Sequence, residues 1–189
     1  MNFEEDIIKS FDVLSRGGLI LYPTDTIWGI GCDATDPEAV EKVFALKKRP
    51  GDKSLIILLA EERDVLKYVT QPDLRVFDFL QSREKPTTVI YEGAVGLAEN
   101  LVHENLSVAI RIVSDPFCRA LIKRFRKPLV STSANVSGMP APASFEEVTD
   151  DIKSGVDYIV QHRQNDRSKA TASSIVRWEK TGEPTIIRP

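Results

Sequence analysis

The sequence predicts a single mixed α/β domain, and three observations lead to this prediction. Its 189 residues, of which 42% are hydrophobic, are enough to form one substantial core. Short apolar runs typical of strands alternate with segments whose apolar residues follow helical spacing. No linker, internal repeat or low-complexity segment divides the chain. We therefore expect one domain over residues 1–189, with polar motifs at strand ends, where such folds bind ligands.

The first residues predict a helix, a strand and a polar turn. Apolar residues recur at positions 3, 7, 11 and 14, the spacing of one buried helical stripe, and Gly17-Gly18 supplies a stop. Residues 19–22 have the pattern of a short strand. Because Pro23 lacks a backbone donor, it forces the chain into a loop that presents residues 24–26 at the strand end. The same Pro-Thr-Asp-Thr segment is also compatible with an ordinary turn.

A second helix leads to two cations at the entrance of a strand. The Asp-Pro pair at 36–37 can cap and start this helix, and apolar residues within 39–46 supply its buried face. Lys47 and Arg49 follow, ahead of the apolar strand 55–59. Two flexible cations in this place can converge on a phosphate chain, although a Lys/Arg cluster is also typical of a solvated loop.

The middle of the chain predicts short elements and one unusual arginine. Residues 65–69 and 74–80 have the pattern of short helices, and residues 87–91 and 108–113 that of strands. Arg111 lies inside the last apolar run. A buried arginine needs an anionic partner, because this side chain is almost never fully buried unpaired. The partner is either a carboxylate of the protein or a bound substrate.

The last third begins with another helix and ends with strands. Asp115-Pro116 starts a helix that runs to residue 125, and a strand follows at 128–131. Ser144 and Glu147 have the spacing of a capping box. Three further strands are predicted at 158–160, 174–178 and 185–187.

The run of small polar residues at 131–135, Ser-Thr-Ser-Ala-Asn, is the most informative segment. An unpaired hydroxyl or amide at the end of a buried strand costs roughly 1–3 kcal/mol, so an oxygen-rich ligand can satisfy these groups. Helix capping is the alternative role of such residues. Together with the polar segments at 24–26 and 47–49, the run suggests one ligand site.

Cysteine and histidine usage disfavours several other kinds of site. Cys32 and Cys118 are distant and lack a C-x-x-C spacing, so we expect reduced core thiols rather than a disulfide framework or a zinc site. With His103 and His162 as the two histidines, a histidine-rich metal site or a serine–histidine–acid triad is disfavoured. We expect no metal site in the protein and a catalysis that rests on cations.

Charge is segregated along the chain, although the net charge is −3. Basic residues gather at 47–53, 123–127 and 163–169 and could focus a positive potential on an anionic ligand, or could be solvated surface groups. The acidic N-terminus has no features of a secretory leader, and no apolar run is long enough to cross a membrane. We expect a cytoplasmic protein without a membrane partner.

These motifs, in this order, resemble the YrdC family of threonylcarbamoyl-adenylate synthases, and the match covers nearly the whole chain. The residues that carry the resemblance are Tyr22-Pro23-Thr24-Asp25-Thr26 with Trp28-Gly29-Ile30, Lys47-x-Arg49-Pro50 with Lys53, Val108 to Arg111, Ser131 to Gly138, Ser173-Ser174-Ile175-Val176, and Ile187-Arg188. The resemblance implies a twisted mixed β-sheet flanked by helices, with a large, positively lined concave cavity. It looks like the short, single-domain bacterial form, because the chain stops at Pro189.

The resemblance also implies an activity. Such a nucleotidyltransferase forms threonylcarbamoyl-AMP and pyrophosphate from L-threonine, bicarbonate and ATP, for the threonylcarbamoyl-adenosine modification of tRNA. ATP would enter as a substrate with Mg²⁺, without a prosthetic group, and tRNA and downstream transfer proteins would be partners. Nucleotidyl transfer suits this sequence, since it needs positioning and charge stabilisation more than a protein nucleophile.

Matched position by position, the resemblance implies two sets of site residues. Lys47 and Arg49 correspond to the phosphate-binding pair and are the expected catalytic residues. The expected ATP contacts are Lys47, Arg49, Lys53, Ser131, Thr132, Ser133, Asn135 and Arg188, and the expected threonine contacts are Thr24, Arg111 and Ser173. Leu58 and Asp115 depart from the family pattern, because longer relatives have histidines there, and Ser174 replaces a threonine. The ATP contacts are therefore better defined than the threonine contacts.

Three other functions remain compatible with parts of the sequence. A double-stranded RNA or tRNA-binding module without catalysis would use the basic clusters, but the chain lacks interleaved aromatic and basic residues. A hydrolase could use Ser131 or Ser133 as nucleophile, but no G-x-S-x-G elbow is present. The third is a carbamoyl transferase, because a similar domain occurs in a hydrogenase-maturation enzyme that adenylates a carbamoyl group. That enzyme is much longer and contains zinc-finger modules, which this sequence lacks.

Overall fold

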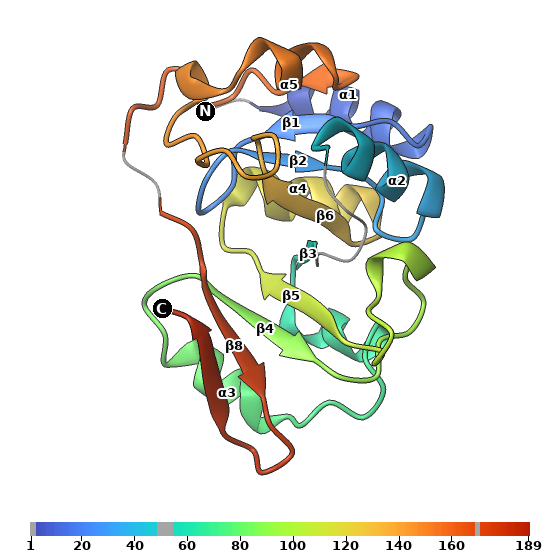
Figure 1. Cartoon of the computed structure of the whole chain (residues 1–189), viewed down its shortest axis with the longest axis vertical. Coiled ribbons are helices and arrows are strands. Elements are labelled where there is room, and N and C mark those ends of the chain that lie inside the picture. Colours follow the sequence, from blue (N-terminus) through green and yellow to red (C-terminus); the bar gives the residue numbers. More distant parts are fainter. Residues whose placement is uncertain (1–2, 49–54, 169–170) are drawn as a thin grey trace.

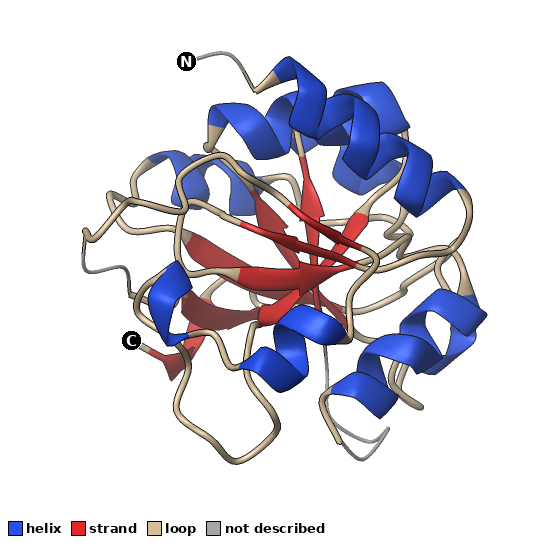
Figure 2. Ribbon diagram, turned by 90° about the horizontal axis from the view of Figure 1, so that it is seen from above, coloured by secondary structure: helices blue, strands red, loops and turns tan. Residues whose placement is uncertain are grey.

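The computed structural model describes residues 3–48, 55–168 and 171–189. A β-sheet runs through the molecule, and helices lie on both of its sides (Figure 1, Figure 2). The strands are β1 (Ile20–Tyr22), β2 (Gly29–Gly31), β3 (Ile56–Leu59), β4 (Thr87–Tyr91), β5 (Val108–Ile112), β6 (Leu129–Ser133), β7 (Tyr158–Ile159), β8 (Ser174–Trp178) and β9 (Pro184–Arg188). The helices are α1 (Glu4–Ser15), α2 (Pro37–Leu46), α3 (Arg75–Gln81), α4 (Pro116–Phe125) and α5 (Asp150–Ser154), with the 3-10 helices η1 (Glu62–Lys67), η2 (Glu99–Leu101) and η3 (Phe145–Glu147).

Within the described residues, the strands form one mixed sheet in the order β7-β1-β2-β6-β3-β5-β4-β8-β9. The pairs β1–β7, β3–β5 and β4–β8 are parallel, and the other neighbours are antiparallel. Parallel neighbours require crossover connections, which put helices over the faces of the sheet. The predicted mixed sheet flanked by helices is confirmed.

Two hydrophobic cores lie on opposite faces of this sheet, because side chains alternate along each strand. In β1, Ile20 and Tyr22 pack in the core that includes α1 and α4, whereas Leu21 packs in the core that includes α2. In β3, Leu58 belongs to the first of these cores and Ile57 to the second. The continuous apolar runs of the sequence therefore reflect strands that are covered on both faces.

Local signals in the sequence correctly predicted most elements. The strands predicted at 87–91 and 174–178 are β4 and β8 with those bounds. Asp36 caps α2, since its carboxylate accepts hydrogen bonds from the backbone N–H groups of Glu38 and Ala39 at 2.9 and 3.2 Å. Cys32 and Cys118 are free and buried, as predicted.

Three local predictions differ from the structure. The helix predicted at 65–69 is the 3-10 helix η1, which begins three residues earlier. The capping box predicted for Ser144 and Glu147 is wrong, because the Ser144 side chain caps no backbone N–H and the Glu147 carboxylate accepts from the Ala143 N–H at 2.8 Å. The strand β2 was not predicted, since two of its three residues are glycines.

The glycines of β2 allow a close approach between β1, β2 and β6. A Cβ atom on Gly31 would lie 2.6 Å from the Tyr22 ring and 2.9 Å from the carbonyl oxygen of Val130. That same carbonyl accepts a hydrogen bond from the Tyr22 hydroxyl at 3.1 Å, and this bond holds the ring in place. Gly31 thus brings a buried tyrosine against the strand that leads to the polar segment 131–135.

We expect Gly31→Ala to destabilise the protein by about 2 kcal/mol, the usual cost of overpacking a closed core. Urea denaturation would measure the change in the free energy of unfolding. Gly29→Ala is the comparison variant and should cost less, because a Cβ atom there would approach its neighbours only to 3.2 Å, against 2.6 Å at Gly31. Equal stability of the Gly31→Ala protein and the wild type would contradict this account of β2.

No helix in the described parts of the chain is both long and apolar enough to cross a membrane.

Candidate functional site

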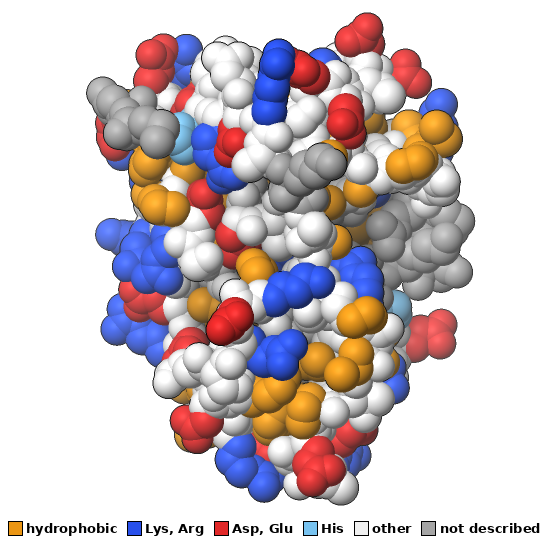
Figure 3. Space-filling view, turned by 90° about the vertical axis from the view of Figure 1, so that its left-hand side faces the viewer, with side chains coloured by type: hydrophobic (Ala, Val, Ile, Leu, Met, Phe, Trp, Pro, Cys, Tyr) orange, Lys and Arg blue, Asp and Glu red, His pale blue; other side chains and the backbone are white. Residues whose placement is uncertain are grey.

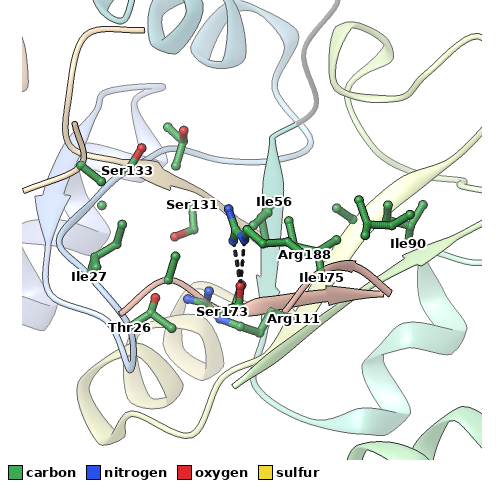
Figure 4. A pocket seen from close by; sticks show the side chains of 16 residues that line it. Thr26, Ile27, Ile56, Ile90, Arg111, Ser131, Ser133, Ser173, Ile175 and Arg188 are labelled. Carbon is green, nitrogen blue, oxygen red and sulfur yellow. Dashed lines mark hydrogen bonds between the residues drawn. The ribbon is translucent and has the colours of Figure 1, made fainter. Parts of the chain in front are cut away.

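A cavity of about 560 Å³ lies over the middle of the sheet (Figure 4). Seven strands and the loops at their ends contribute to it. Its lining consists of Thr26, Ile27, Gly29, Ile56, Ile90, Ala109, Arg111, Ser131, Thr132, Ser133, Ala141, Ala172, Ser173, Ile175, Ile187 and Arg188. The described lining is apolar on the β3–β4 side and hydroxyl-rich on the β6 side, which suits a ligand with both kinds of surface.

Strand register explains why residues from distant parts of the chain meet here. Ile56 in β3 lies opposite Ala109 of β5 on one side and Ser131 of β6 on the other. Ala109 in turn lies opposite Ile90 of β4. Residues in one such row point to the same face of a sheet. The row therefore forms a continuous floor of the cavity across four strands.

Arg111 enters the cavity wall from β5 with a side chain that is 4% exposed. Its Nη2 lies 3.1 Å from the Asp25 Oδ1, within ion-pair distance. The orientation of the two groups does not make a hydrogen bond, and Arg111 Nε and Nη2 have no hydrogen-bond partner among the described residues. A carboxylate of the protein thus balances the charge of Arg111 without a hydrogen bond to its Nε or Nη2.

The turn after β1 is held by its own side chains. Thr24, which is buried, accepts a hydrogen bond from the Thr26 N–H at 3.0 Å and donates one to the Ile27 carbonyl at 2.8 Å. From outside, Arg163 donates to the Thr24 carbonyl at 3.1 Å and pairs with Asp115 at 2.9 Å. The hydroxyl of Thr24 is therefore engaged in the turn, and Thr26 and Ile27 are the residues of this turn that line the cavity.

Arg188 lines the same cavity from β9. Its Nε and Nη2 donate to the Ser173 carbonyl at 3.1 and 2.8 Å, and the Ser173 hydroxyl lies 2.8 Å from the buried Thr88 hydroxyl. Figure 4 shows the guanidinium groups of Arg188 and Arg111 turned toward the same part of the cavity as Ser131. Burial, and after it the charge of Arg111, lower the pKa of Arg188. Two nearby cations favour an anionic ligand between them.

Lys47 supports the end of β6 rather than lining the cavity. Its side chain is 1% exposed, and its ammonium donates to the backbone carbonyls of Ser133 and Asn135 at 2.5 and 2.6 Å. The Lys47 carbonyl accepts from the Ser137 N–H at 2.8 Å. The end of α2 and the polar segment after β6 are therefore bound together at both the side chain and the backbone of one residue.

Asn135 is partly engaged in this loop. Its Nδ2 donates to the carbonyls of Val136 and Met139 at 3.0 and 2.7 Å. Its Oδ1 is buried and has no hydrogen-bond partner among the described residues. A buried amide oxygen without a partner is costly, so this atom is a candidate for contact with a ligand or with water.

The structure brings together most residues that the sequence selected. Six of them line the cavity: Arg111, Ser131, Thr132, Ser133, Ser173 and Arg188. Thr24, Lys47 and Asn135 lie next to it, as supports of segments that line it. Arg49 and Lys53 lie outside the described residues.

Sequence reasoning missed several residues of the site, and Asp25 and Thr88 are two polar ones that contact predicted site residues. Asp25 was visible inside the Pro-Thr-Asp-Thr segment, but nothing local showed that it would meet Arg111, 86 positions later. Thr88 lies opposite Arg111 in the sheet and orients the Ser173 hydroxyl. Neither histidine is among the described lining residues, so Ser131 and Ser133 have no histidine base there.

The electrostatics of the described lining are positive. Its two charged residues are Arg111 and Arg188, and it includes no Asp or Glu. Figure 3 shows Lys and Arg side chains across the middle of one face of the molecule, although the net charge is −3. In the described parts of the chain, no group of three or more Asp, Glu, His or Cys residues could hold a metal ion.

Comparisons with known proteins cover nearly the whole chain. The Sua5/YciO/YrdC family model, described as "Telomere recombination", matches residues 12–189. Proteins named threonylcarbamoyl-AMP synthase are 32% identical in Pseudoalteromonas translucida, over 85% of this chain and 87% of that protein, and 31% identical in Vibrio campbellii, over 96% of both. The crystal structure of P. abyssi Sua5 complexed with L-threonine is similar, with a TM-score of 0.86 and 24% identity. That likeness covers 98% of this chain and 54% of the Sua5 chain and supports the fold.

Proposed function

The chain belongs to the Sua5/YciO/YrdC family, and we propose that it is an L-threonylcarbamoyladenylate synthase that uses L-threonine, bicarbonate and ATP. The two relatives that carry this name match most of the chain at 31–32% identity. The observation that carries the proposal is Arg111, a buried guanidinium in the cavity wall whose Nε and Nη2 have no hydrogen-bond partner among the described residues. A planar guanidinium in this place suits the carboxylate of an amino acid.

The reaction would proceed in two steps. The amine of threonine adds to the carbon of bicarbonate, and loss of water gives N-carboxy-threonine. The new carboxylate then attacks the α-phosphorus of ATP, the bond to the β-phosphate oxygen breaks, and pyrophosphate leaves. Both steps require the reactants to be held together and the growing negative charge to be neutralised. A positively lined cavity can provide both, and neither step requires a protein nucleophile.

The residues divide between the two substrates by place in the cavity. Arg111 would bind the threonine carboxylate, with Ser173 beside it and Thr24 shaping the adjoining turn. The hydroxyls of Ser131, Thr132 and Ser133 would contact the nucleotide. The other ATP contacts that we propose are Asn135, through its buried Oδ1, and Arg188.

Cations near the triphosphate complete the proposal. Lys47 would hold the segment after β6 in place for the nucleotide and add positive charge beside the phosphates. Arg49 and Lys53, although outside the described residues, keep their proposed role as phosphate ligands. Because the described lining has no carboxylate, Mg²⁺ would be held by the phosphate oxygens of ATP.

The product would be consumed by a further reaction. A threonylcarbamoyl-adenylate is an activated acyl phosphate, so proteins that transfer the threonylcarbamoyl group to adenosine in tRNA would act downstream. Such a role implies that the protein works in the cytoplasm. Direct contact with tRNA is not required for the adenylation step.

The test is pyrophosphate release from purified protein. With ATP, Mg²⁺, L-threonine and bicarbonate present together, we expect release that stops when either threonine or bicarbonate is left out. Mass spectrometry of the same mixture should show threonylcarbamoyl-AMP. Equal release without threonine would exclude the proposal. Tight binding of tRNA at rising salt, without pyrophosphate release, would indicate an RNA-binding module instead.

A further inference from the structure

Asp25 is the described residue that balances the charge of Arg111. The two side chains are 7% and 4% exposed, and Arg111 Nη2 lies 3.1 Å from Asp25 Oδ1. The nearest cross-strand neighbours of Arg111 are Leu58 and Thr88, which carry no charge. A buried cation without an opposite charge is costly, so the fold depends on Asp25 to compensate the charge of Arg111 in the cavity wall.

The other oxygen of Asp25 is anchored to the chain just after β5. Asp25 Oδ2 accepts hydrogen bonds from the Ser114 N–H at 3.1 Å and the Ser114 hydroxyl at 3.4 Å. Asp25 therefore contacts both the strand that carries Arg111 and the residue after it. One carboxylate oxygen fixes the position of Asp25, and the other faces the guanidinium.

The contact with Arg111 neutralises charge without using the donors of the guanidinium. Asp25 Oδ1, Arg111 Nε and Arg111 Nη2 all have no hydrogen-bond partner among the described residues. In a bidentate arginine–carboxylate pair, two N–H groups would be consumed by the protein. Here neither Nε nor Nη2 is hydrogen-bonded to Asp25, and Arg111 lines the cavity. The arrangement prepares the guanidinium for a second carboxylate that arrives with the substrate.

A second cation makes this compensation more important. Arg188 faces the same cavity, and the described lining has no carboxylate. Without Asp25, the guanidinium groups of Arg111 and Arg188 would line the same cavity, and no described carboxylate would balance the charge of Arg111. Arg111 would then turn away from the cavity or recruit any small anion from solution.

We propose that Asp25 is a positioning residue that sets the affinity of the site for the amino-acid carboxylate by compensating the charge of Arg111 and orienting its guanidinium. The proposal rests on the proposed function for the identity of the substrate. It predicts that removal of the Asp25 charge weakens threonine binding and leaves ATP binding unchanged. A residue that merely supported the fold would alter both substrates or reduce the active fraction.

The first experiment is steady-state kinetics of Asp25→Asn, which keeps an oxygen acceptor for Ser114 and removes the charge. We expect the KM for L-threonine to rise about tenfold or more, while the KM for ATP stays within about twofold of the wild type. Asp12→Asn, the same change at an exposed position of α1, is the control and should alter neither value. A threonine KM within about twofold of the wild type in Asp25→Asn would overturn the proposal.

The second experiment needs no substrate and compares melting temperatures. Asp25→Asn should melt at least about 5 °C below the wild type, because it leaves a buried cation unbalanced. Adding Arg111→Met to this variant removes that cation and should restore part of the lost stability. Equal melting of the single and double variants would overturn the proposal, and so would failure of both to fold. If only the single variant fails to fold, the compensation is supported.

The two proposals can fail separately. Absence of threonine-dependent pyrophosphate release in the wild type would remove the proposed function. The melting comparison would still decide whether Asp25 balances Arg111.

Discussion

Replacing Arg111 with methionine should raise the KM for L-threonine by about 10²-fold, the range expected when one partner of a buried charged contact is removed. Methionine keeps much of the side-chain volume but removes the donors Nε and Nη2, which have no hydrogen-bond partner among the described residues. It also leaves the Asp25 carboxylate buried and unpaired. Steady-state pyrophosphate release at varied threonine and saturating ATP would measure the effect.

Two controls separate binding from folding in this experiment. Arg111→Lys keeps the charge and removes the planar fork, so it should retain stability better than Arg111→Met but still bind threonine poorly. The double variant Arg111→Met with Asp25→Asn removes the unpaired carboxylate and should fold while keeping the raised KM for threonine. An unchanged KM for threonine in Arg111→Met would show that the amino acid binds elsewhere.

Replacing Lys47 with methionine should destabilise the protein by about 3 kcal/mol, because hydrogen bonds to a charged group are worth about 1.5–3 kcal/mol each. Its ammonium donates to the carbonyls of Ser133 and Asn135 in a site where the side chain is 1% exposed. Without it, the segment after β6 loses its anchor to the end of α2. We therefore also expect the KM for ATP to rise and the rate of pyrophosphate release to fall by about 10²-fold, the effect of losing one charge-stabilising group.

Lys48→Met is the matched control for this variant, since the neighbouring lysine is exposed. It should leave both the free energy of unfolding and the KM for ATP close to those of the wild type. Chemical denaturation and steady-state kinetics at varied ATP would measure the two properties. If Lys47→Met were as stable and as active as Lys48→Met, the buried ammonium would have neither a structural nor a catalytic role.

The two substitutions should affect the binding of different substrates. Arg111 should act on threonine, because it lines the cavity from β5. Lys47 should act on ATP, because it holds the segment that includes Ser133 and Asn135. A variant of each residue, measured against both substrates, would therefore test the division of the cavity that we propose.

Local signals in the sequence were sufficient for the helices, most strands and the family. Helical spacing, the Asp-Pro pairs at 36–37 and 115–116, and short apolar runs depend on neighbours within a few positions, so they can be interpreted without the fold. The polar segment 131–135 was equally visible, because hydroxyl and amide groups behind an apolar strand are unusual. The sequence also showed that Arg111 required an anionic partner.

Only the tertiary structure decided which groups meet. It paired Arg111 with Asp25, directed the ammonium of Lys47 to two backbone carbonyls instead of into the cavity, and made a strand of Gly29–Gly31. Each of these outcomes depends on strand order and register, which bring together residues that are far apart in the sequence. Contacts across a sheet leave no periodic pattern in either segment, so the chain must fold before its charges find their partners.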